Sequence, residues 1–279
     1  MDWIDALILG IVQGLSEYLP ISSSGHLEIF KQILDLDLES ESSLEFSVML
    51  HVATVLSTIV VLWREFVPLC VSFFTIRRDA NFTYVCKILL SCIPVAIVGL
   101  FFKDSISALF DGNLTVVGVC LIITAGLLSL AYFGRTAPLQ QRLLRREGFR
   151  EHDITWVDAF VIGIAQAVAV LPGLSRSGST IATGLLLGDK RDEVAKFSFF
   201  MVIIPILGEG LLDIKKMLEV SAAGTQSADV PLTSMIVGFL AAFIIGCAAC
   251  KWMIELVKKG RLIWFAVYCV IAGILCLVW

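Results

Sequence analysis

Two short polar stretches interrupt an otherwise apolar sequence, and both carry side chains that can do chemistry. The first, residues 13–26, reads Gln-Gly-Leu-Ser-Glu-Tyr-Leu-Pro-Ile-Ser-Ser-Ser-Gly-His. Gln13 and Glu17 are four residues apart, so they share one face of a helix. Pro20 is expected to end that helix, and the serines after it suit a loop that caps the next one. Glu17 and His26 are therefore ionisable groups on either side of a hydroxyl-rich loop.

The second stretch, residues 171–180, places Arg176 between two serines and ahead of another apolar helix. A helix N-terminus offers unsatisfied backbone N–H groups and the positive end of the helix dipole. The guanidinium of Arg176 adds a planar fork that suits phosphate oxygens. If the two loops meet, they surround one anion-binding pocket. The expected phosphate-binding residues are Ser22, Ser24, Gly25, Ser175, Arg176, Ser177 and Gly178.

Glu17 and His26 would then supply proton transfer or a nucleophile beside the bound phosphate. This combination suits phosphoryl transfer better than ion conduction. Simpler roles stay open: Arg176 could clamp loop carbonyls, His26 could cap a helix, and Glu17 could merely pair with Arg176. His51 is expected to pack between helices rather than to react.

The elements that position these loops are apolar helices. Apolar residues make up 58% of the 279-residue chain and charged residues 16%, whereas a soluble domain is about half apolar and about a quarter charged. The mean hydropathy is +0.90. Because a membrane span needs about 17–25 apolar residues, we expect an all-α integral membrane protein, with the two shortest blocks extending into their flanks. The blocks are residues 46–63, 88–102, 114–133, 197–212, 232–250 and 262–279.

Lysine and arginine are distributed unevenly between these blocks. The segments that hold 16 of the 21 positive residues are 64–87, 134–153, 189–196 and 251–261. Such segments usually face the cytoplasm, and six spans alternate correctly on that assumption. Two apolar stretches remain, residues 3–30 and 156–188, and each begins and ends on one side of the membrane. Because proline and a serine–glycine cluster also break each of them, we expect two re-entrant helix pairs, one from each side.

The two re-entrant stretches resemble each other. At an offset of 153 residues, nine residues are identical, beginning at Trp3 and ending at Gly25. Three spans separate the two stretches, and because that number is odd, the second copy must be inverted. We therefore expect one membrane domain built from two repeats, residues 1–153 and 154–279. Paired broken segments usually mark a midplane binding site, although a duplication with no site at the breaks is the alternative.

Two further features bear on processing and on cysteine chemistry. The N-terminus opens with Asp2 and Asp5 and has no positive stretch, so we expect no cleaved signal peptide. The eight cysteines lie in or beside apolar blocks without metal-ligand spacing. They are expected to be small hydrophobic residues, neither disulfides nor zinc ligands.

The motifs together resemble the undecaprenyl-pyrophosphate phosphatase family, also called the bacitracin-resistance family. The first signature runs from Gln13 through Glu17 and Pro20 to His26, and the second from Pro172 to Gly178. The resemblance covers essentially the whole chain, and the paired signatures are highly specific.

This resemblance implies dephosphorylation of a C55 isoprenoid diphosphate to the monophosphate carrier of cell-wall synthesis. The protein would lie in the cell membrane, with a pocket that opens to the outer face. By motif position, Glu17 and His26 correspond to an essential acid and histidine, and Arg176 to a phosphate-binding arginine. Ser23 or His26 would be the nucleophile or base. A divalent cation, Mg²⁺ or Ca²⁺, is usually invoked in the family, with Glu17 as its possible contact here.

One residue departs from the family pattern. Gln13 stands where many members have glutamate, which weakens the case for metal binding through the pair and leaves Glu17 as the main acidic group. The expected partners are a long-chain polyprenyl diphosphate and membrane lipids. No nucleotide-binding motif appears, so we expect no use of a nucleotide. No nucleic-acid partner is expected either. A polyprenyl-phosphate flippase with the same anion site is the alternative function, and the prenyl chain length and a homo-oligomeric state are left open.

Overall fold

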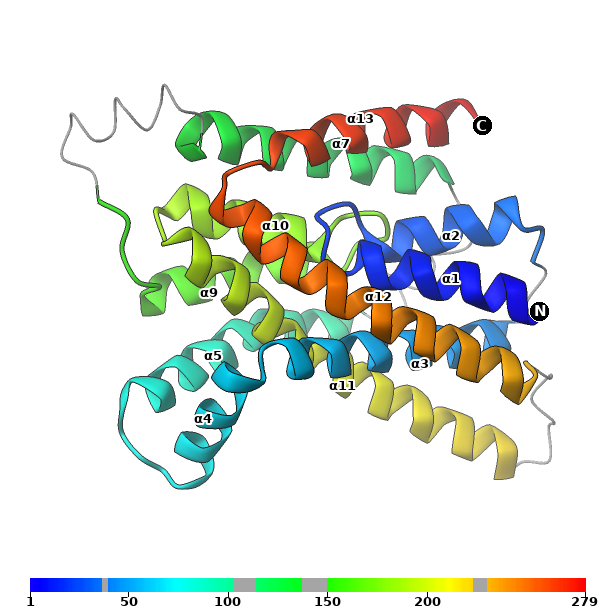
Figure 1. Cartoon of the computed structure of the whole chain (residues 1–279), viewed down its shortest axis with the longest axis horizontal. Helices are drawn as coiled ribbons and strands as arrows, with labels where there is room; N and C mark the ends of the chain where they lie inside the picture. The colour runs from blue at the N-terminus through cyan, green and yellow to red at the C-terminus, as the bar shows by residue number, and fades with distance from the viewer. Residues whose placement is uncertain (37–39, 103–113, 137–149, 223–229) are drawn as a thin grey trace.

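The computed structural model describes residues 1–36, 40–102, 114–136, 150–222 and 230–279, and within these ranges every regular element is helical. Figure 1 shows long helices packed side by side, with shorter helices among them. The elements are α1 (Trp3–Ser16), α2 (Ser23–Ile33), α3 (Ser40–Val61), α4 (Trp63–Phe74), α5 (Ala80–Phe101), α7 (Leu114–Ala131), the π-helical turn η1 (Tyr132–Thr136), α9 (Trp156–Val168), α10 (Arg176–Leu187), α11 (Arg191–Ala222), α12 (Leu232–Lys258) and α13 (Ile263–Val278).

Several of these helices are long and apolar enough to cross a membrane. Among the described residues they are Ala80–Phe101, Leu114–Arg135 and Leu232–Lys258. A bent pair, Glu45–Val61 and Trp63–Phe74, qualifies when its two parts are taken together, and its bend is 92°. The helices of the two broken stretches are shorter, as the sequence predicts.

The side chains on the helices also fit a lipid environment. Leu100 on α5 and Ile244 on α12 expose 71% and 62% of their surface, whereas Thr124 and Gln166 are fully buried. Large outward-facing apolar surfaces are unfavourable in water and are expected against lipid. The expected all-α, multi-pass membrane protein is confirmed, while the number of six spans and the re-entrant paths remain predictions. All eight cysteines are free.

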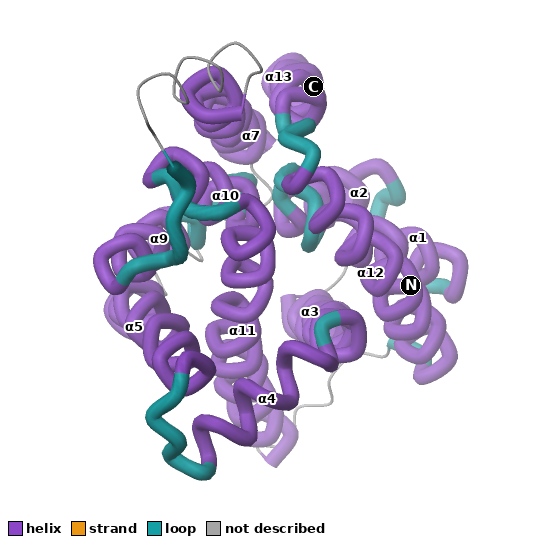
Figure 2. Tube along the Cα trace, turned by 60° about the vertical axis from the view of Figure 1, so that its left-hand side comes forward, coloured by secondary structure: helices purple, strands orange, loops and turns teal. Residues whose placement is uncertain are grey.

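Helix α4 lies where the sequence indicated only a basic connection. Helix α3 ends at Val61, the chain turns sharply, and α4 leads away from it (Figure 2). Ser72 on α4 donates a hydrogen bond to the carboxylate of Asp79, which also accepts from the backbone N–H of Phe82. This cap starts α5 at Ala80, well before its apolar block, so the extension expected for that short block is present.

The two broken stretches begin in the same way. In α1 the carboxylate of Asp2 accepts from the backbone of Asp5, whose side chain reaches back to the backbone of Asp2. In α9 the same capping box is made by Thr155 and Asp158. Each residue lies 153 positions from its counterpart. A capping box satisfies two otherwise unpaired N–H groups, so both stretches retain the same helix-start signal.

The first helix of each broken stretch packs on a long helix from the other half of the chain. Helix α1 packs on α12 and α9 packs on α5, while α7 lies beside α13 (Figure 2). A methyl group on Gly10 would lie 2.4 Å from the carbonyl oxygen of Gly238. One on Gly163, the counterpart of Gly10, would lie 2.4 Å from that of Ser91. Each broken stretch therefore packs on a long helix of the other half, an arrangement that an inverted repeat would produce. The repeat boundary at residue 153 remains a prediction.

The basic segments that the structure describes gather at one end of the molecule. Figure 1 places the α4–α5 connection, the segment before α9 and the end of α12 toward the left, and both chain termini at the right. A backbone bridge between His152 and Asp189 brings the α10–α11 turn, with Lys190, to the same end. This grouping agrees with the expected cytoplasmic face. Residues 103–113 and 137–149, which the topology also used, lie outside the described ranges.

The close approach of α9 to α5 can be tested with one methyl group. In Gly163→Ala, the added Cβ would meet backbone atoms of Ser91, so we expect a loss of stability of about 1–3 kcal/mol. In Gly126→Ala on α7, the same atom meets nothing within 4 Å, and alanine is the better helix former by about 1 kcal/mol. Thermal unfolding in one detergent should show a lower midpoint for the first variant only. Equal midpoints would contradict the described packing.

Candidate active site

The two serine loops meet in the middle of the molecule (Figure 1). A Cβ atom on Gly25 would lie 3.1 Å from the Cα atom of Gly173, and one on Gly178 would lie 3.2 Å from the Cβ atom of Pro20. These contacts are equivalent, since Gly173 and Pro20 are 153 residues apart. The Ser177 hydroxyl also donates to the backbone oxygen of the residue before Pro20, at 3.2 Å. The two loops therefore cross each other tightly, as the sequence anticipated for a shared pocket.

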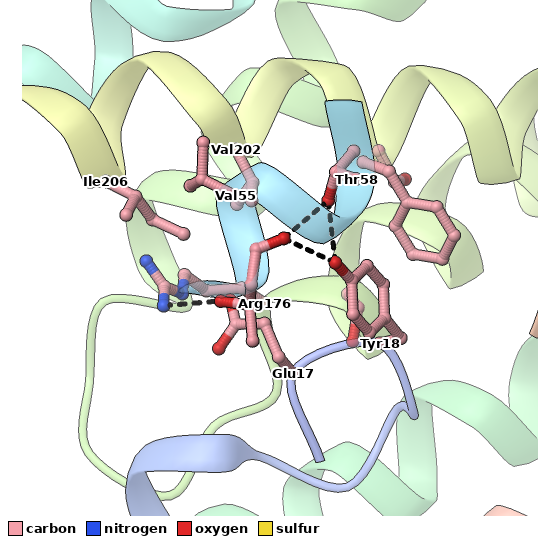
Figure 3. A pocket seen from close by; sticks show the side chains of 11 residues that line it. Glu17, Tyr18, Val55, Thr58, Arg176, Val202 and Ile206 are labelled. Atoms are coloured by element: carbon pink, nitrogen blue, oxygen red, sulfur yellow. Dashed lines mark hydrogen bonds and ion pairs between the residues drawn. The ribbon is translucent and has the colours of Figure 1, made fainter. Parts of the chain in front are cut away.

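Glu17 is the centre of the polar contacts between the loops. Its side chain is 7% exposed, and one oxygen, Oε2, accepts hydrogen bonds from Gln13 Nε2 at 2.9 Å and Ser23 Oγ at 2.7 Å. The other oxygen, Oε1, lies 3.3 Å from a guanidinium nitrogen of Arg176 (Figure 3). His51 Nε2 on α3 is 3.8 Å from Oε2. The carboxylate thus connects both loops and two helices.

Both serine loops are shaped to start a helix. Ser22 caps α2 by accepting from the backbone N–H of Gly25, and Ser175 caps α10 by accepting from that of Gly178. Ser22 has φ 72°, a conformation that costs a non-glycine residue on the order of 1–3 kcal/mol. The exposed donors at the start of a helix attract anions. Two such helix starts therefore face one region of the structure.

A small cavity lies between these helix starts. Its lining residues are Ser16, Glu17, Ser22, Ser23, Ser24, Leu174, Ser175, Arg176 and Ser177. Most of the residues that the sequence predicts to bind phosphate therefore lie together around this cavity. Gly25 and Gly178 are the exceptions, because they lie behind the cavity and allow the loops to approach. The structure places these residues, and their roles in binding remain our proposal.

His26 faces away from this cavity. Its Nδ1 lies 2.8 Å from the backbone oxygen of Ser22, which can only accept, so Nδ1 carries the proton. In the neutral ring Nε2 then accepts from the Tyr268 hydroxyl at 2.7 Å, and the two rings stack. The imidazole therefore ties the serine loop to α13. Its expected position beside the phosphate is not what the structure shows, because the first turn of α2 points this side chain toward α13.

A second cavity adjoins the ion pair on its other side and is largely apolar. Besides Glu17 and Arg176 it is lined by Tyr18, Thr54, Val55, Thr58, Ser177, Ser198, Phe199, Val202 and Ile206. The Tyr18 hydroxyl donates to the carbonyl oxygen of Thr54 at 2.6 Å and lies 2.8 Å from the hydroxyl of Thr58, which fixes the turn after α1 to α3 (Figure 3). An anion at Arg176 would thus have an apolar wall of α3 and α11 beside it.

Comparison with known proteins identifies this arrangement. Residues 6–275 match the family described as bacitracin resistance protein BacA. The chain belongs to this family. A protein of Bacteroides fragilis is 52% identical over 278 residues, which cover all of this chain and 98% of that protein. One of Parabacteroides distasonis is 52% identical over 98% of this chain and 97% of its own.

A more distant relative also matches over nearly its whole length. A protein of Methanosphaera stadtmanae is 33% identical over all of this chain and 98% of its own. All three relatives are named undecaprenyl-diphosphatase. The resemblance inferred from the two signatures is therefore confirmed.

Two residues of this BacA-family site were not found from the sequence. His51 was expected only to pack between helices, yet it lies beside Glu17, and Tyr268 was not singled out although it contacts His26. The position of His51 as a rare ionisable residue within an apolar block was a usable signal. Tyr268 gave none, because it is separated from His26 by 242 residues.

The ion pair between the loops predicts a particular pattern of stability. Glu17→Gln and Arg176→Gln each leave one partner uncompensated in a mostly buried place, so each should lower stability by about 1–3 kcal/mol. The double variant should lose clearly less than the sum of the two. Thermal unfolding of the four proteins in one detergent measures the coupling. Additive losses would show that the pair is not energetically coupled.

Proposed function

We propose that this membrane protein is an undecaprenyl-diphosphatase, which hydrolyses undecaprenyl diphosphate to the monophosphate carrier and inorganic phosphate. Its activity would support recycling of the lipid carrier in cell-wall synthesis and resistance to bacitracin. The observation that carries the proposal is the convergence of Arg176, Glu17 and the serine hydroxyls from both loops on one cavity. Full-length relatives with that name support the same conclusion.

The substrate has two chemically different parts, and the site offers a surface for each. The diphosphate would bind between the N-termini of α2 and α10, where Arg176 and the loop serines supply donors. The prenyl chain would follow the apolar cavity along Val55, Val202 and Ile206. Because the guanidinium already contacts Glu17, a bound phosphate would share it with that carboxylate.

Ser23 is the best placed nucleophile. Its hydroxyl donates to Glu17 at 2.7 Å, so the carboxylate can take the proton as the oxygen attacks the terminal phosphorus. The bond from that phosphorus to the bridging oxygen breaks, and lipid monophosphate leaves. Glu17 passes its proton to the leaving lipid monophosphate, so it can accept a proton when water attacks the phosphoserine. It returns that proton to the Ser23 oxygen as phosphate leaves. In this scheme Arg176 stabilises the negative charge of the transition state.

His26 has a different part in this scheme from the one the sequence suggested. Both ring nitrogens are engaged, one with the backbone oxygen of Ser22 and one with Tyr268. We propose that the imidazole holds the serine loop, including the unusual backbone conformation of Ser22, so that Ser23 keeps its contact with Glu17. Loss of His26 would then act through the position of the nucleophile.

A divalent cation, Mg²⁺ or Ca²⁺, fits this site when the substrate supplies ligands too. Glu17 offers a carboxylate, and the side-chain oxygen of Gln13 is buried without a hydrogen-bond partner. Such oxygens, together with phosphate oxygens, suit Mg²⁺ or Ca²⁺. When bound, the cation would neutralise charge on the phosphates. Glutamine at position 13 removes a negative charge, but it keeps an oxygen ligand.

The orientation in the membrane follows from the basic end of the molecule. We propose that this end faces the cytoplasm of the cell, in keeping with the usual distribution of positive residues. The pocket would then open to the outer face, as the resemblance to the family implies. A flippase that uses the same anion site has no support from the names of the relatives, all of which describe hydrolysis.

Phosphate release from a long-chain prenyl diphosphate tests the function in purified protein. In detergent, with Mg²⁺, with Ca²⁺ and with a chelator, we expect release by the unaltered chain and a loss of at least about 100-fold in Ser23→Ala and Arg176→Ala. Gly126→Ala, remote from both cavities, serves as the control. Transport needs two compartments and hydrolysis does not, so folded protein without any release would favour the flippase. Release that survives both substitutions would place the chemistry elsewhere.

His51 lies beside Glu17 but was not expected to react, and its substitution gives a separate test of the mechanism. His51→Gln removes a ring that lies 3.8 Å from the proposed base but makes no contact with Arg176 that the structure records. We expect kcat to fall by about tenfold, equivalent to about 1.4 kcal/mol, with KM nearly unchanged. The pH profile of kcat should shift as well. An unchanged profile and kcat would mean that His51 only fills space.

A further inference from the structure

A second group of ionisable side chains lies at the basic end, away from both cavities. His152 precedes α9, Asp158 lies in the first turn of α9, and Asp189 lies in the α10–α11 turn. His152 Nδ1 is 3.4 Å from Asp189 Oδ1 and 3.8 Å from Asp158 Oδ2. One ligand atom from each residue lies within 4.8 Å of the other two. Among the described residues, this is where three such groups converge.

Asp189 is the unusual member of the group. Its side chain is fully buried, and neither carboxylate oxygen has a hydrogen-bond partner among the described residues. A buried carboxylate without donors is costly unless a positive partner accompanies it. The two carboxylates of the cluster therefore call for a positive partner, which a protonated His152 or a bound cation could supply.

The nearby cationic side chains are engaged with other acids. Lys190 pairs with Asp153 and approaches Glu193, and Arg191 lies 3.4 Å from Glu151. A deprotonated Asp189 could then be compensated by a protonated His152 or by an external cation bound between His152 and the two carboxylates.

The backbone holds the three side chains in place. The N–H of His152 donates to the oxygen of Gly188 at 3.2 Å, and the N–H of Lys190 donates to the oxygen of His152 at 2.9 Å. Gly188 has φ 102°, which suits glycine and produces the turn that carries Asp189. The segment before α9 and the α10–α11 turn are thereby fixed to each other.

We propose that His152, Asp158 and Asp189 bind a divalent transition-metal cation, with Zn²⁺ the best match. Imidazole nitrogens and carboxylate oxygens both bind zinc, imidazole favours transition metals over Mg²⁺ or Ca²⁺, and a fourth position would be left for water. Bonds of about 2.0 Å in a tetrahedron put ligand atoms about 3.3 Å apart, close to the 3.4 Å found between His152 and Asp189. Nδ1 also lies 3.1 Å from the Asp153 carbonyl oxygen, so the cation would replace the proton shared there.

Such a cation would join the two ends of the second broken stretch. It would hold the segment before α9 to the turn after α10, and α10 begins at Arg176. The site is separate from the divalent cation proposed beside Glu17, because the two share no residue. It does not depend on the proposed function, and its occupancy can be measured without an enzyme assay.

Zinc binding by the purified full chain in detergent tests the proposal. After treatment with a chelator and its removal, calorimetric titration with Zn²⁺ should show one saturable site, and the thermal midpoint should rise on saturation. Asp189→Asn and His152→Ala should each abolish both effects. Asp153→Asn, which alters a neighbouring acid outside the cluster, should retain them. Glu17→Gln should also retain them, which separates this site from the one beside the serine loops.

Three outcomes would overturn the proposal. One is the absence of saturable binding of Zn²⁺ and Mn²⁺ by folded protein, which would mean that the carboxylates share a proton instead. Another is unchanged binding in Asp189→Asn and His152→Ala, which would place the cation elsewhere. The third is loss of binding in Glu17→Gln alone. Because Asp189→Asn removes a buried charge, it is expected to fold, so it remains informative if His152→Ala is unstable.

Discussion

A carboxylate and a guanidinium share a mostly buried place between two loops, and each offsets the cost of burying the other. Glu17 comes from the end of α1 and Arg176 from the start of α10, so the contact of 3.3 Å requires two distant parts of the chain to be held within a fraction of an ångström. Much of the framework serves this requirement. Glycines allow helix backbones to touch, capped helix starts fix the loops, and Tyr18 fastens the turn after α1 to α3.

The sequence predicts this framework well because its signals are local or repeated. Pro20 and the serines that follow it end one helix and start the next, and the lengths of apolar blocks indicate helices that span lipid. The repetition at 153 residues indicates that the loops are equivalent, and their meeting follows from an inverted arrangement. The pairing of Glu17 with Arg176 was itself an open alternative from the sequence, and it is present.

What the sequence did not reveal depends on which way a helix faces. His26 and Ser23 are both in the first turn of α2, yet one is directed to Tyr268 and the other to Glu17. Helix α2 packs on α1 and α7, and His26 reaches Tyr268 on α13, so its rotation depends in part on helices that are distant in sequence. The sharp bend after α3 has a similar origin. It occurs at Leu62 without glycine or proline, so tertiary packing decides it.

The two loops occupy equivalent places but carry different residues. Val170 stands where the first loop has Glu17, and Ser23 stands where the second has Arg176. In this chain the two loops differ, one supplying the carboxylate of Glu17 and the other the guanidinium of Arg176 to a single polar pocket. Copying either loop over the other would keep the frame but leave two charges of the same sign, two carboxylates in one case and two guanidinium groups in the other. The symmetry therefore belongs to the scaffold, and the chemistry depends on its having been broken.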